Sequence, residues 1–392
     1  MPRQTELDWL RGLMLVLMTV THLPTWFSAH VGQPFGFVSA AEGFVFLSAY
    51  LVGSVYSHVA NTRGYAAMRT ALWGRAGKVY AAHVALLLLL LLLLVPIAEV
   101  RGAHAITDLA SFYASRPHTA VVTGLLLAYN PPLLDILPMY VVFLLLSPLV
   151  LGYGSRRGWG ALLCVSAMLW LYSQVGGAAH LYQSVARLIE WPVPYAQTGA
   201  FSWLAWQLLW LAGLRAGALR VAAGDPGTAV SAWSRASLWA ATIFAATFFV
   251  WRHVQGQVPF GPDAALNALF DKWHLGPLRL LNFAVLALIA VHGRRVLATW
   301  AERSSIATLG RASLTVFCAH LVVCLVLLAM YGDEVKPHPS LLEAALLVGT
   351  LVTLYAVARA SLAGSKLLRD RFIAGYVQPR PVVVDVSARA RR

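Results

Sequence analysis

Ten apolar segments of about 20 residues divide the chain, and each is long enough to cross the ~30 Å hydrocarbon core of a membrane as an α-helix. With 59% hydrophobic and 12% charged residues, the chain is far more apolar than a soluble domain, in which about a quarter of the residues are charged. The sequence therefore predicts an all-α integral membrane protein, a bundle of about ten transmembrane helices. The segments lie near residues 10–29, 37–57, 79–98, 133–153, 159–176, 199–219, 233–251, 275–298, 309–331 and 341–363.

The basic residues predict how these segments are oriented. Lys and Arg concentrate in cytoplasmic loops of membrane proteins. If the amino terminus is cytoplasmic, all but seven of the 30 basic residues fall in segments on that side, which predicts that both termini are cytoplasmic. Topology then explains the net charge of +14, and we expect no nucleic-acid partner. The seven exceptions are Arg101, Arg116, Arg187, Arg252, Lys272, Arg279 and Lys336.

The chain shows no internal repeat, which favours one membrane domain over residues 1–363. Residues 364–392 form a basic tail that we expect to be disordered and drawn to anionic lipid. Glu6 and Asp8 precede a long first apolar run, so this segment does not resemble a cleavable signal peptide. The three cysteines lie inside predicted spans and show no pattern of a disulfide framework or a metal site.

The first apolar segment carries three ionisable residues on one stripe. At ~100° and ~1.5 Å per residue, Arg11 and His22 differ by about 20° in azimuth and about 16 Å in height on an ideal helix. Asp8 lies on the same stripe. An ionisable residue inside a membrane is costly and indicates a functional site. The alternative is that Asp8 pairs with Arg11 at the helix start and that His22 bonds a neighbouring helix.

The second segment places a carboxylate at a depth similar to that of His22. Glu42 lies about 8 Å below the outer end of this helix. A carboxylate facing an imidazole would fix its tautomer and stabilise the imidazolium, as a general base requires. We therefore predict a His22–Glu42 pair. Ser48 lies about 120° from Glu42 on the helix, which weakens its assignment to the same site.

Two further polar residues lie in the apolar segments. His320 lies near the middle of the ninth segment, where it is either a second histidine of the site or part of the core. Arg279 lies near an outer helix end, where its side chain could snorkel to the surface.

Between residues 57 and 78, Arg alternates with Tyr and Trp. This pattern is typical of a membrane-surface helix, and it could also form a cationic cradle for a phosphorylated ligand.

Aromatic and amide residues mark two predicted outer segments. Asn130 precedes the fourth span and Asp135 lies at its outer end, and Trp206 and Gln207 lie near the start of the sixth. Tryptophan and tyrosine at helix ends are typical of the aromatic belt of membrane proteins. The same side chains could also stack on sugar rings and bond sugar hydroxyls, so both interpretations stay open.

Several of these motifs together resemble the OpgC-type succinyltransferases of osmoregulated periplasmic glucans, within the integral-membrane acyltransferases. Arg11 and His22 reproduce the family's Arg, ten residues, His signature. "AEGFVFLSAY" resembles its acidic residue followed six positions later by Ser-Gly, except that Ala49 replaces the glycine. "GRAGKVYAAH" resembles the basic segment that opens the third helix. Further similar blocks are "NPPLLDILPMYVVF", "LAWQLL", "LGPLRLLNF" and "LGRASLTVF".

The resemblance implies an O-succinyltransferase or O-acetyltransferase in the bacterial inner membrane. Its donor would be cytoplasmic acyl-CoA, most simply succinyl-CoA, and its acceptor a hydroxyl of a periplasmic glucan. In this interpretation Arg11, Arg75 and Lys78 hold the donor, His22 removes the sugar proton and Glu42 supports it. We expect Asn130, Asp135, Tyr140, Trp206 and Gln207 to bind the acceptor, Asp8, Ser48, Arg279, Asn282 and His320 to support the site, and no metal to take part.

A proton-coupled transporter is the alternative, with His22 and Glu42 as a proton relay. This alternative explains the intramembrane charges equally well. It explains less well the basic and aromatic residues before the third span, and transporters often contain internal repeats.

Overall fold

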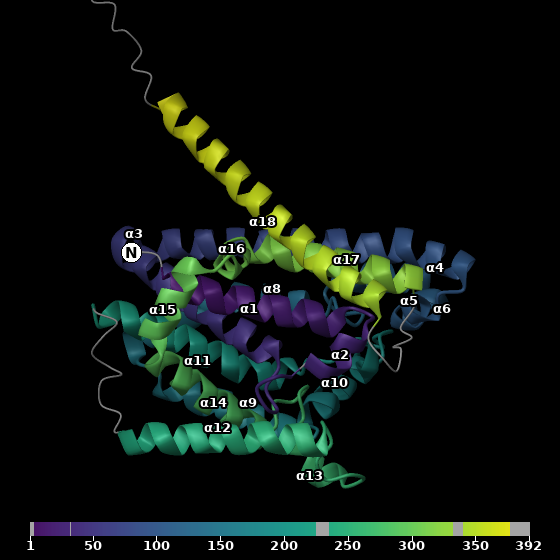
Figure 1. Ribbon diagram of the computed structural model, residues 1–392, viewed down its shortest axis with the longest axis horizontal. Helices are drawn as coiled ribbons and strands as arrows, with labels where there is room; N and C mark the ends of the chain where they lie inside the picture. The colour runs from purple at the N-terminus through teal and green to yellow at the C-terminus, as the bar shows by residue number, and fades with distance from the viewer. Residues whose placement is uncertain (1–3, 32, 225–234, 332–339, 377–392) are drawn as a thin grey trace, which may run out of the picture.

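The computed structural model describes residues 4–31, 33–224, 235–331 and 340–376. Helices make up the regular structure of these residues, apart from one isolated bridge between Phe35 and Val38. The longest helices run side by side in a bundle, and α18 (Leu341–Tyr376) rises away from it at one end (Figure 1). The predicted all-α class is thus confirmed.

Helix α1 (Thr5–His22) holds the whole polar stripe predicted from the sequence. Glu6 and Asp8 lie in its first turn, where their negative charges interact favourably with the helix dipole. The helix ends at His22, where Leu23 leaves the helical conformation and donates its N–H to the carbonyl of Thr19. A short helix, α2 (Trp26–Val31), follows. Arg11 and His22 therefore lie on one continuous helix.

Helix α3 (Ala40–Leu88) contains the second predicted span and the beginning of the third. Gly64, at φ 84°, breaks the helical path, and this left-handed conformation is one that glycine adopts readily. Residues 58–78, which connect the second and third predicted spans, are helical apart from this break. The second limb continues through a π-helical segment, Leu89–Leu94, into α4 (Val95–Arg101).

Four short helices and two longer ones lie between α4 and α11. The longer helices are α8 (Ile136–Arg157) and α9 (Gly160–Gln174), and both pack against α11. Helix α10 departs from the direction of α9 by 85°. The short elements are α5 (His104–Leu109), α6 (Ser111–Ser115), α7 (Pro117–Leu125), α10 (Gly177–Leu188) and a 3₁₀ turn at Tyr195–Gln197.

Helix α11 (Trp203–Ala222) crosses α3 at very close range. Gly213 faces the Cβ of Ala49, and Gly53 faces the backbone of Leu214, so larger residues at either glycine would clash. Small residues of this kind let helix backbones approach in membranes. Ala49, which replaces the family glycine, is fully buried and is accommodated by the glycine on α11.

The remaining helices complete the bundle. Helix α17 packs against α3 and α18, and α12 packs against α14. Helix α18 continues beyond the predicted domain boundary at residue 363, while residues 377–392 of the predicted tail lie outside the described part of the chain. The elements are α12 (Arg235–Gln255), α13 (Ala264–Ala268), α14 (Pro277–His292), α15 (Arg294–Arg303), α16 (Ile306–Arg311) and α17 (Ser313–Tyr331).

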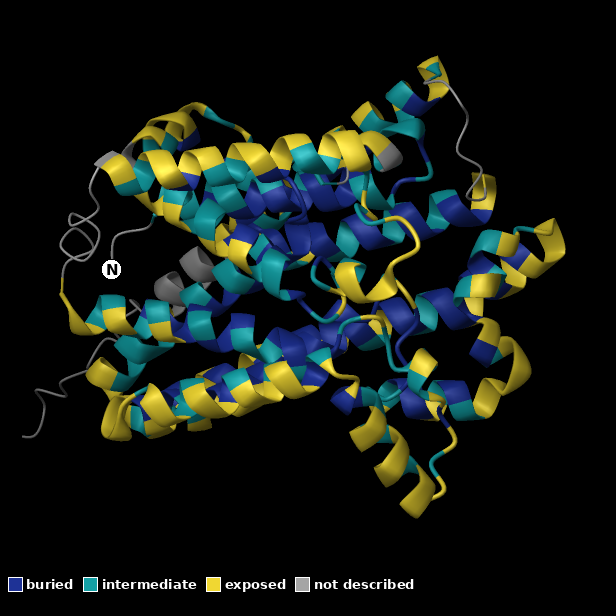
Figure 2. Cartoon of the chain, turned by 90° about the horizontal axis from the view of Figure 1, so that it is seen from below, coloured by how far each residue is buried: buried dark blue, intermediate teal, exposed yellow. Residues whose placement is uncertain are grey.

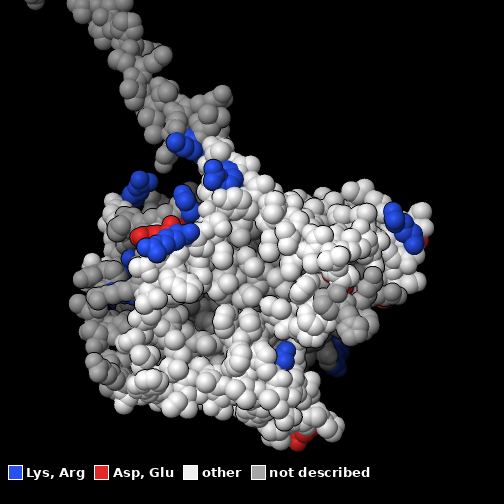
Figure 3. Space-filling view, viewed as in Figure 1, with Lys and Arg blue, Asp and Glu red and all other residues white. Residues whose placement is uncertain are grey.

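The surface of the bundle fits a lipid environment. Buried residues gather where the helices face each other, whereas outward faces are exposed (Figure 2). Leu149, Met168, Ile243 and Val352 are each more than half exposed, and apolar exposure on this scale indicates contact with lipid. Lys and Arg gather mainly at one end of the bundle, near the start of α1, and leave a broad uncharged face (Figure 3). The chain is a multi-pass membrane protein.

The predicted number of ten spans is not confirmed. Every predicted segment overlaps a helix, but four described helical stretches are long and apolar enough to cross a membrane, or six if two bent pairs each count as one span. Helix α1 combines Glu6, Asp8 and Arg11 in 18 residues, and such charge density lowers its mean hydropathy. Asp8 and Arg11 are nevertheless buried in the protein interior.

Candidate functional site

Two histidines meet at the end of α1. His22 Nδ1 lies 3.2 Å from Nε2 of His320 on α17, and the two rings stack with their centroids 5.5 Å apart. His320 is fully buried, whereas His22 remains partly exposed. Because a neutral imidazole has one donor and one acceptor nitrogen, this contact couples the tautomers of the two rings. When Nδ1 of His22 donates to His320, Nε2 of His22 carries a lone pair that can accept a proton.

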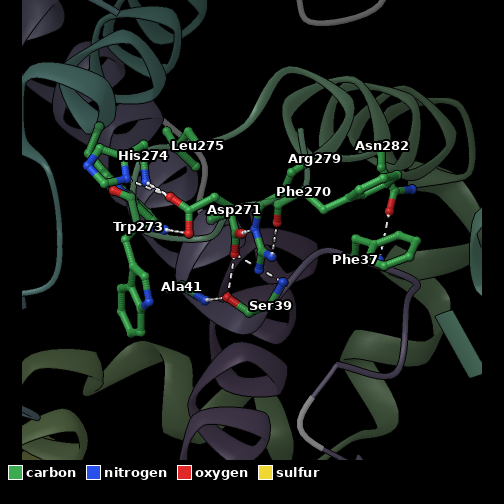
Figure 4. A network of polar contacts seen from close by, with 12 residues as sticks. Phe37, Ser39, Ala41, Phe270, Asp271, Trp273, His274, Leu275, Arg279 and Asn282 are labelled. Carbon is green, nitrogen blue, oxygen red and sulfur yellow. Dashed lines mark hydrogen bonds and ion pairs between the residues drawn. The ribbon is translucent and has the colours of Figure 1, made fainter. Parts of the chain in front are cut away.

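Glu42 has different partners from the one predicted. Its carboxylate accepts hydrogen bonds from the backbone N–H (3.0 Å) and the hydroxyl of Ser39, which closes a capping box at the start of α3. Its other oxygen forms an ion pair with Nε of Arg279 on α14 (Figure 4). The predicted His22–Glu42 pair is therefore replaced by a His22–His320 pair. The capping signal S-x-x-E was present in the sequence and indicated this local role.

Arg279 and Asn282 connect α14 to the loop before α3. Arg279 is 2% exposed, so it does not snorkel to the surface, and it also donates to the carbonyl of Phe270 at 3.3 Å. The side-chain oxygen of Asn282 accepts the N–H of Phe37 at 3.1 Å (Figure 4). Both residues therefore support the packing around Glu42.

A pocket opens between α1, α3, α8, α11 and α17. Its space is about 460 Å³, including the open mouth. The pocket contains the buried guanidinium of Arg11, which donates to the hydroxyl of Ser313. Four predicted site residues from three helices meet here, together with an apolar wall. They are Arg11, Ser48, Arg75 and Tyr140, and the wall includes Phe44, Val52, Val79, Trp210 and Phe317.

The pocket regroups two of the predicted residues. Tyr140 was expected to bind the acceptor, but it lies in the pocket with Arg11, and its hydroxyl donates to the carbonyl of Phe44 at 3.1 Å. Ser48 lies in the pocket and not beside Glu42, as its azimuth on α3 indicated. Lys78 is exposed, about one turn beyond Arg75 on the second limb of α3. Ser313 and Phe317, which no motif singled out, belong to the block "LGRASLTVF".

Aromatic rings connect this pocket to the histidine pair. Phe317 lines the pocket, and its ring centroid lies 4.9 Å from that of His320 in an edge-to-face arrangement. Phe44 stacks on Phe317 with centroids 5.7 Å apart. One phenyl ring therefore separates the pocket wall from the histidines.

Four residues expected to bind a sugar are occupied by structural contacts. Trp206 is fully buried, and its indole N–H donates to the carbonyl of Trp273 at 3.1 Å. Gln207 exchanges hydrogen bonds with Ser166 on α9. Asn130 donates to the carbonyl of Thr198 at 2.8 Å. These contacts orient the segments around them and leave little surface for a sugar.

Asp135, the fourth of these residues, lies just before α8. Its carboxylate accepts the N–H of Ala200 at 2.9 Å. Burial raises the pKa of Asp135 to about 6, although the bond from Ala200 and the charge of Lys272 favour its ionised form.

The segment after α13 carries a cation, Lys272, that no sequence motif singled out. Lys272 Nζ lies 4.5 Å from the ring centroid of Trp273 and 5.9 Å from that of Phe201. Asp271 accepts hydrogen bonds from His274 and from the N–H of Trp273 (Figure 4). Burial opposes ionisation of Asp271, but these bonds give a net lowering of its pKa.

Among the described residues, no three His, Cys, Asp or Glu side chains are arranged to hold a metal ion. The model of the family described as OpgC protein matches residues 3–363, nearly the whole chain. Neither a curated protein nor a solved structure matches the chain.

Proposed function

Since the chain belongs to the OpgC protein family, we propose that it transfers an acyl group, in the first instance succinyl, from cytoplasmic acyl-CoA to a hydroxyl of a periplasmic glucan. At the family level, membership supports a glucan-modifying acyltransferase. The proposal places the protein in the bacterial inner membrane, with ten spans and both termini in the cytoplasm. The end of the bundle where Lys and Arg gather is then the cytoplasmic end (Figure 3).

The observation that carries this proposal is the sequence of contacts from Arg11 to His22. The pocket around Arg11 adjoins Phe317, Phe317 contacts His320, and His320 bonds His22. Arg11 and His22 lie about 16 Å apart along α1. The flexible thioester arm of acyl-CoA, bound in the pocket, and a sugar bound at the partly exposed His22 would meet at the imidazole of His22.

The basic residues near the pocket suit the donor. Arg75 at the pocket and Lys78 one turn further along α3 would hold the phosphates of acyl-CoA on the exposed limb of the helix. Arg11 and Tyr140 would bond the polar groups of the arm, and the apolar wall would surround its carbon atoms.

The proposed reaction begins at Nε2 of His22. This nitrogen removes the proton of the sugar hydroxyl while the sugar oxygen attacks the thioester carbonyl. The carbon–sulfur bond then breaks, and His22 returns the proton to the CoA thiolate. His320 holds the reactive tautomer of His22, the role that the sequence predicted for Glu42. The alternative is a relay through an acyl-histidine: the imidazole attacks the thioester carbonyl and releases the CoA thiolate, and the sugar oxygen then displaces the imidazole while its proton passes to the thiolate.

The transporter alternative loses its main support. It requires His22 and Glu42 to exchange a proton, but the Glu42 carboxylate is engaged by Ser39 and Arg279. The proposed acyl transfer does not require a contact between His22 and Glu42, because His320 takes the place of the carboxylate.

The test is transfer by the purified full-length protein in lipid nanodiscs. With succinyl-CoA and periplasmic glucan, mass spectrometry should detect succinylated glucan with the wild type and none with His22→Ala. His180→Ala removes an exposed histidine and is the matched control. Succinyl-CoA should raise the thermal stability of both variants, because it binds the folded state. Normal transfer by His22→Ala would refute the mechanism.

A further inference from the structure

Helix α10 turns away from α9 at a sharp bend that contains two glycines. The two helices lie at 85° to each other. Gly176 has a φ of 78°, a left-handed conformation that glycine adopts readily. A Cβ atom at Gly177 would lie 2.5 Å from the ring of Tyr172 on α9, so glycine lets α10 begin directly beside that ring. A helix at this angle to a membrane-spanning helix runs nearly parallel to the membrane surface.

The side chains of α10 form three faces, which lie about 120° apart at ~100° per residue. The first face packs on the protein: Ala178 is buried, and the hydroxyl of Tyr182 donates to the carbonyl of Val193 at 2.8 Å. The second face is polar and exposed, and it consists of His180, Gln183, Ser184 and Arg187. The third face is apolar and exposed, and it consists of Leu181, Val185 and Leu188.

The apolar face of α10 lies on the side of the helix that faces α9. Gly177 shares this side with Leu181 and Leu188, because residues four and eleven positions apart differ by about 40° and 20° in azimuth. The direction in which a Cβ atom of Gly177 would point leads to the ring of Tyr172. The apolar side chains therefore face back along the bundle, toward the level of the membrane, and the polar face is turned away from them.

The same apolar face continues a surface of α9 that is exposed to lipid. Apolar and aromatic side chains are exposed along α9 at intervals of three or four residues, at Val165, Met168, Tyr172 and Val175. Tyr172 joins this surface to the start of α10, and tyrosine is typical of the level where a membrane meets water. Leu181 and Leu188 are 49% and 84% exposed, and lipid would remove this apolar area from water.

We propose that α10 binds the surface of the lipid bilayer, with Leu181, Val185 and Leu188 inserted at the boundary between headgroups and acyl chains and with Gln183 and Arg187 in water. An apolar face beside a polar one is typical of helices that lie in a membrane interface. Figure 1 places α10 at the end of the bundle opposite the start of α1, which is the periplasmic end in the proposed topology. The inference depends on the membrane location of the chain and is independent of the proposed acyl transfer.

The experiment measures the depth of spin labels on the full-length protein in nanodiscs of phosphatidylethanolamine and phosphatidylglycerol. The three native cysteines are first replaced by alanine. Labels are then attached to Leu181→Cys, Val185→Cys and Leu188→Cys, and, as controls on the polar face of the same helix, to Gln183→Cys and Arg187→Cys. The ratio of accessibility to oxygen, which dissolves in lipid, over accessibility to a water-soluble nickel complex should be several-fold higher on the apolar face.

Two results would overturn the proposal. Equal access of the nickel complex to both faces would mean that α10 lies in water. Exclusion of both reagents from the apolar face would mean that protein covers it, either another part of this chain or a second copy.

A second measurement uses the wild type, so the proposal stays testable if the chain without cysteines does not fold. A phospholipid with a diazirine at the glycerol end of an acyl chain is photolysed in the nanodisc, and mass spectrometry locates its adducts. Adducts should form on α10 at Leu181, Val185 or Leu188 as well as on the exposed stripe of α9, which is the internal control. Adducts on Val165 or Met168 with none on α10 would refute the proposal.

Discussion

His22 Nδ1 and His320 Nε2 lie 3.2 Å apart although 298 residues separate them in the chain. The contact joins the last residue of α1 to the interior of α17. It gives the partly exposed imidazole a fixed partner, and the partner is itself fully buried. In the proposed reaction His22 is the base and His320 positions it, so that an imidazole takes the place that a carboxylate commonly has.

The first prediction concerns His320. We expect His320→Ala to lower kcat by about 100-fold, because His22 loses the partner that fixes its tautomer, while KM for acyl-CoA changes little. His320→Gln keeps an acceptor for the His22 N–H and should restore part of kcat. Steady-state kinetics in nanodiscs check both. Equal losses with Ala and Gln, at unchanged stability, would contradict a positioning role.

The second prediction separates Glu42 from catalysis. Glu42→Gln removes one charge of a buried ion pair and leaves Arg279 uncompensated, so it should destabilise the fold by about 3 kcal/mol. The double variant Glu42→Gln/Arg279→Met should cost less than the sum of the two single changes. Thermal unfolding in detergent measures the three variants. If Glu42→Gln keeps the wild-type unfolding temperature and only its kcat is lowered, Glu42 has a catalytic role and this prediction is wrong.

The sequence predicted relations between residues of one helix better than contacts between residues of different helices. Helical periodicity placed Arg11 and His22 on one stripe and set Ser48 apart from Glu42, because both relations lie within single helices. It did not predict that His22 would meet α17 or that Tyr140 would lie beside Arg11. Those contacts depend on how separate helices pack, and one sequence contains no direct signal of that packing.

The outer residues have structural partners that the sequence did not predict, for a different reason. Asn, Gln and Trp are the side chains that bind sugars, and they also satisfy carbonyls where helices end. Trp206 and Asn130 satisfy carbonyls: the indole of Trp206 donates to the carbonyl of Trp273, and the amide of Asn130 donates to that of Thr198. Residue type alone does not separate these uses. Lys272 was counted only for topology because it lies in a short segment without a motif.

The third prediction tests the donor pocket with two arginines of one helix. Arg75→Met should raise KM for acyl-CoA by about three- to ten-fold, because it removes a charge that lines the pocket. Arg69 lies on the same limb of α3 but stacks on Trp73, with its guanidinium carbon 5.1 Å from the ring centroid. Arg69→Met should therefore leave KM unchanged. Equal effects of the two variants would indicate a diffuse electrostatic contribution and no defined phosphate site.

The fourth prediction concerns Trp206 as a structural residue. Trp206→Phe removes the indole donor to the Trp273 carbonyl and keeps most of the buried ring, so we expect a loss of stability of about 1 kcal/mol and an unchanged KM for glucan. Thermal unfolding and glucan titration measure the two effects. A large rise in KM at constant stability would return Trp206 to the acceptor site.

The fifth prediction is a pH dependence from Asp135. Its pKa is about 6 in the folded protein and near 3.8 in an unfolded chain, so the folded state favours the protonated form. Stability from this group is fully present below pH 3.8 and is lost as the pH rises through 6, a change of up to about 3 kcal/mol. Asp135→Asn keeps an acceptor for the Ala200 N–H and does not ionise. The variant should therefore gain unfolding temperature relative to the wild type between pH 5 and pH 7.5, as measured in detergent at constant ionic strength. A difference between the two proteins that stays constant across this range would mean that the Lys272 charge fully offsets the burial of the carboxylate.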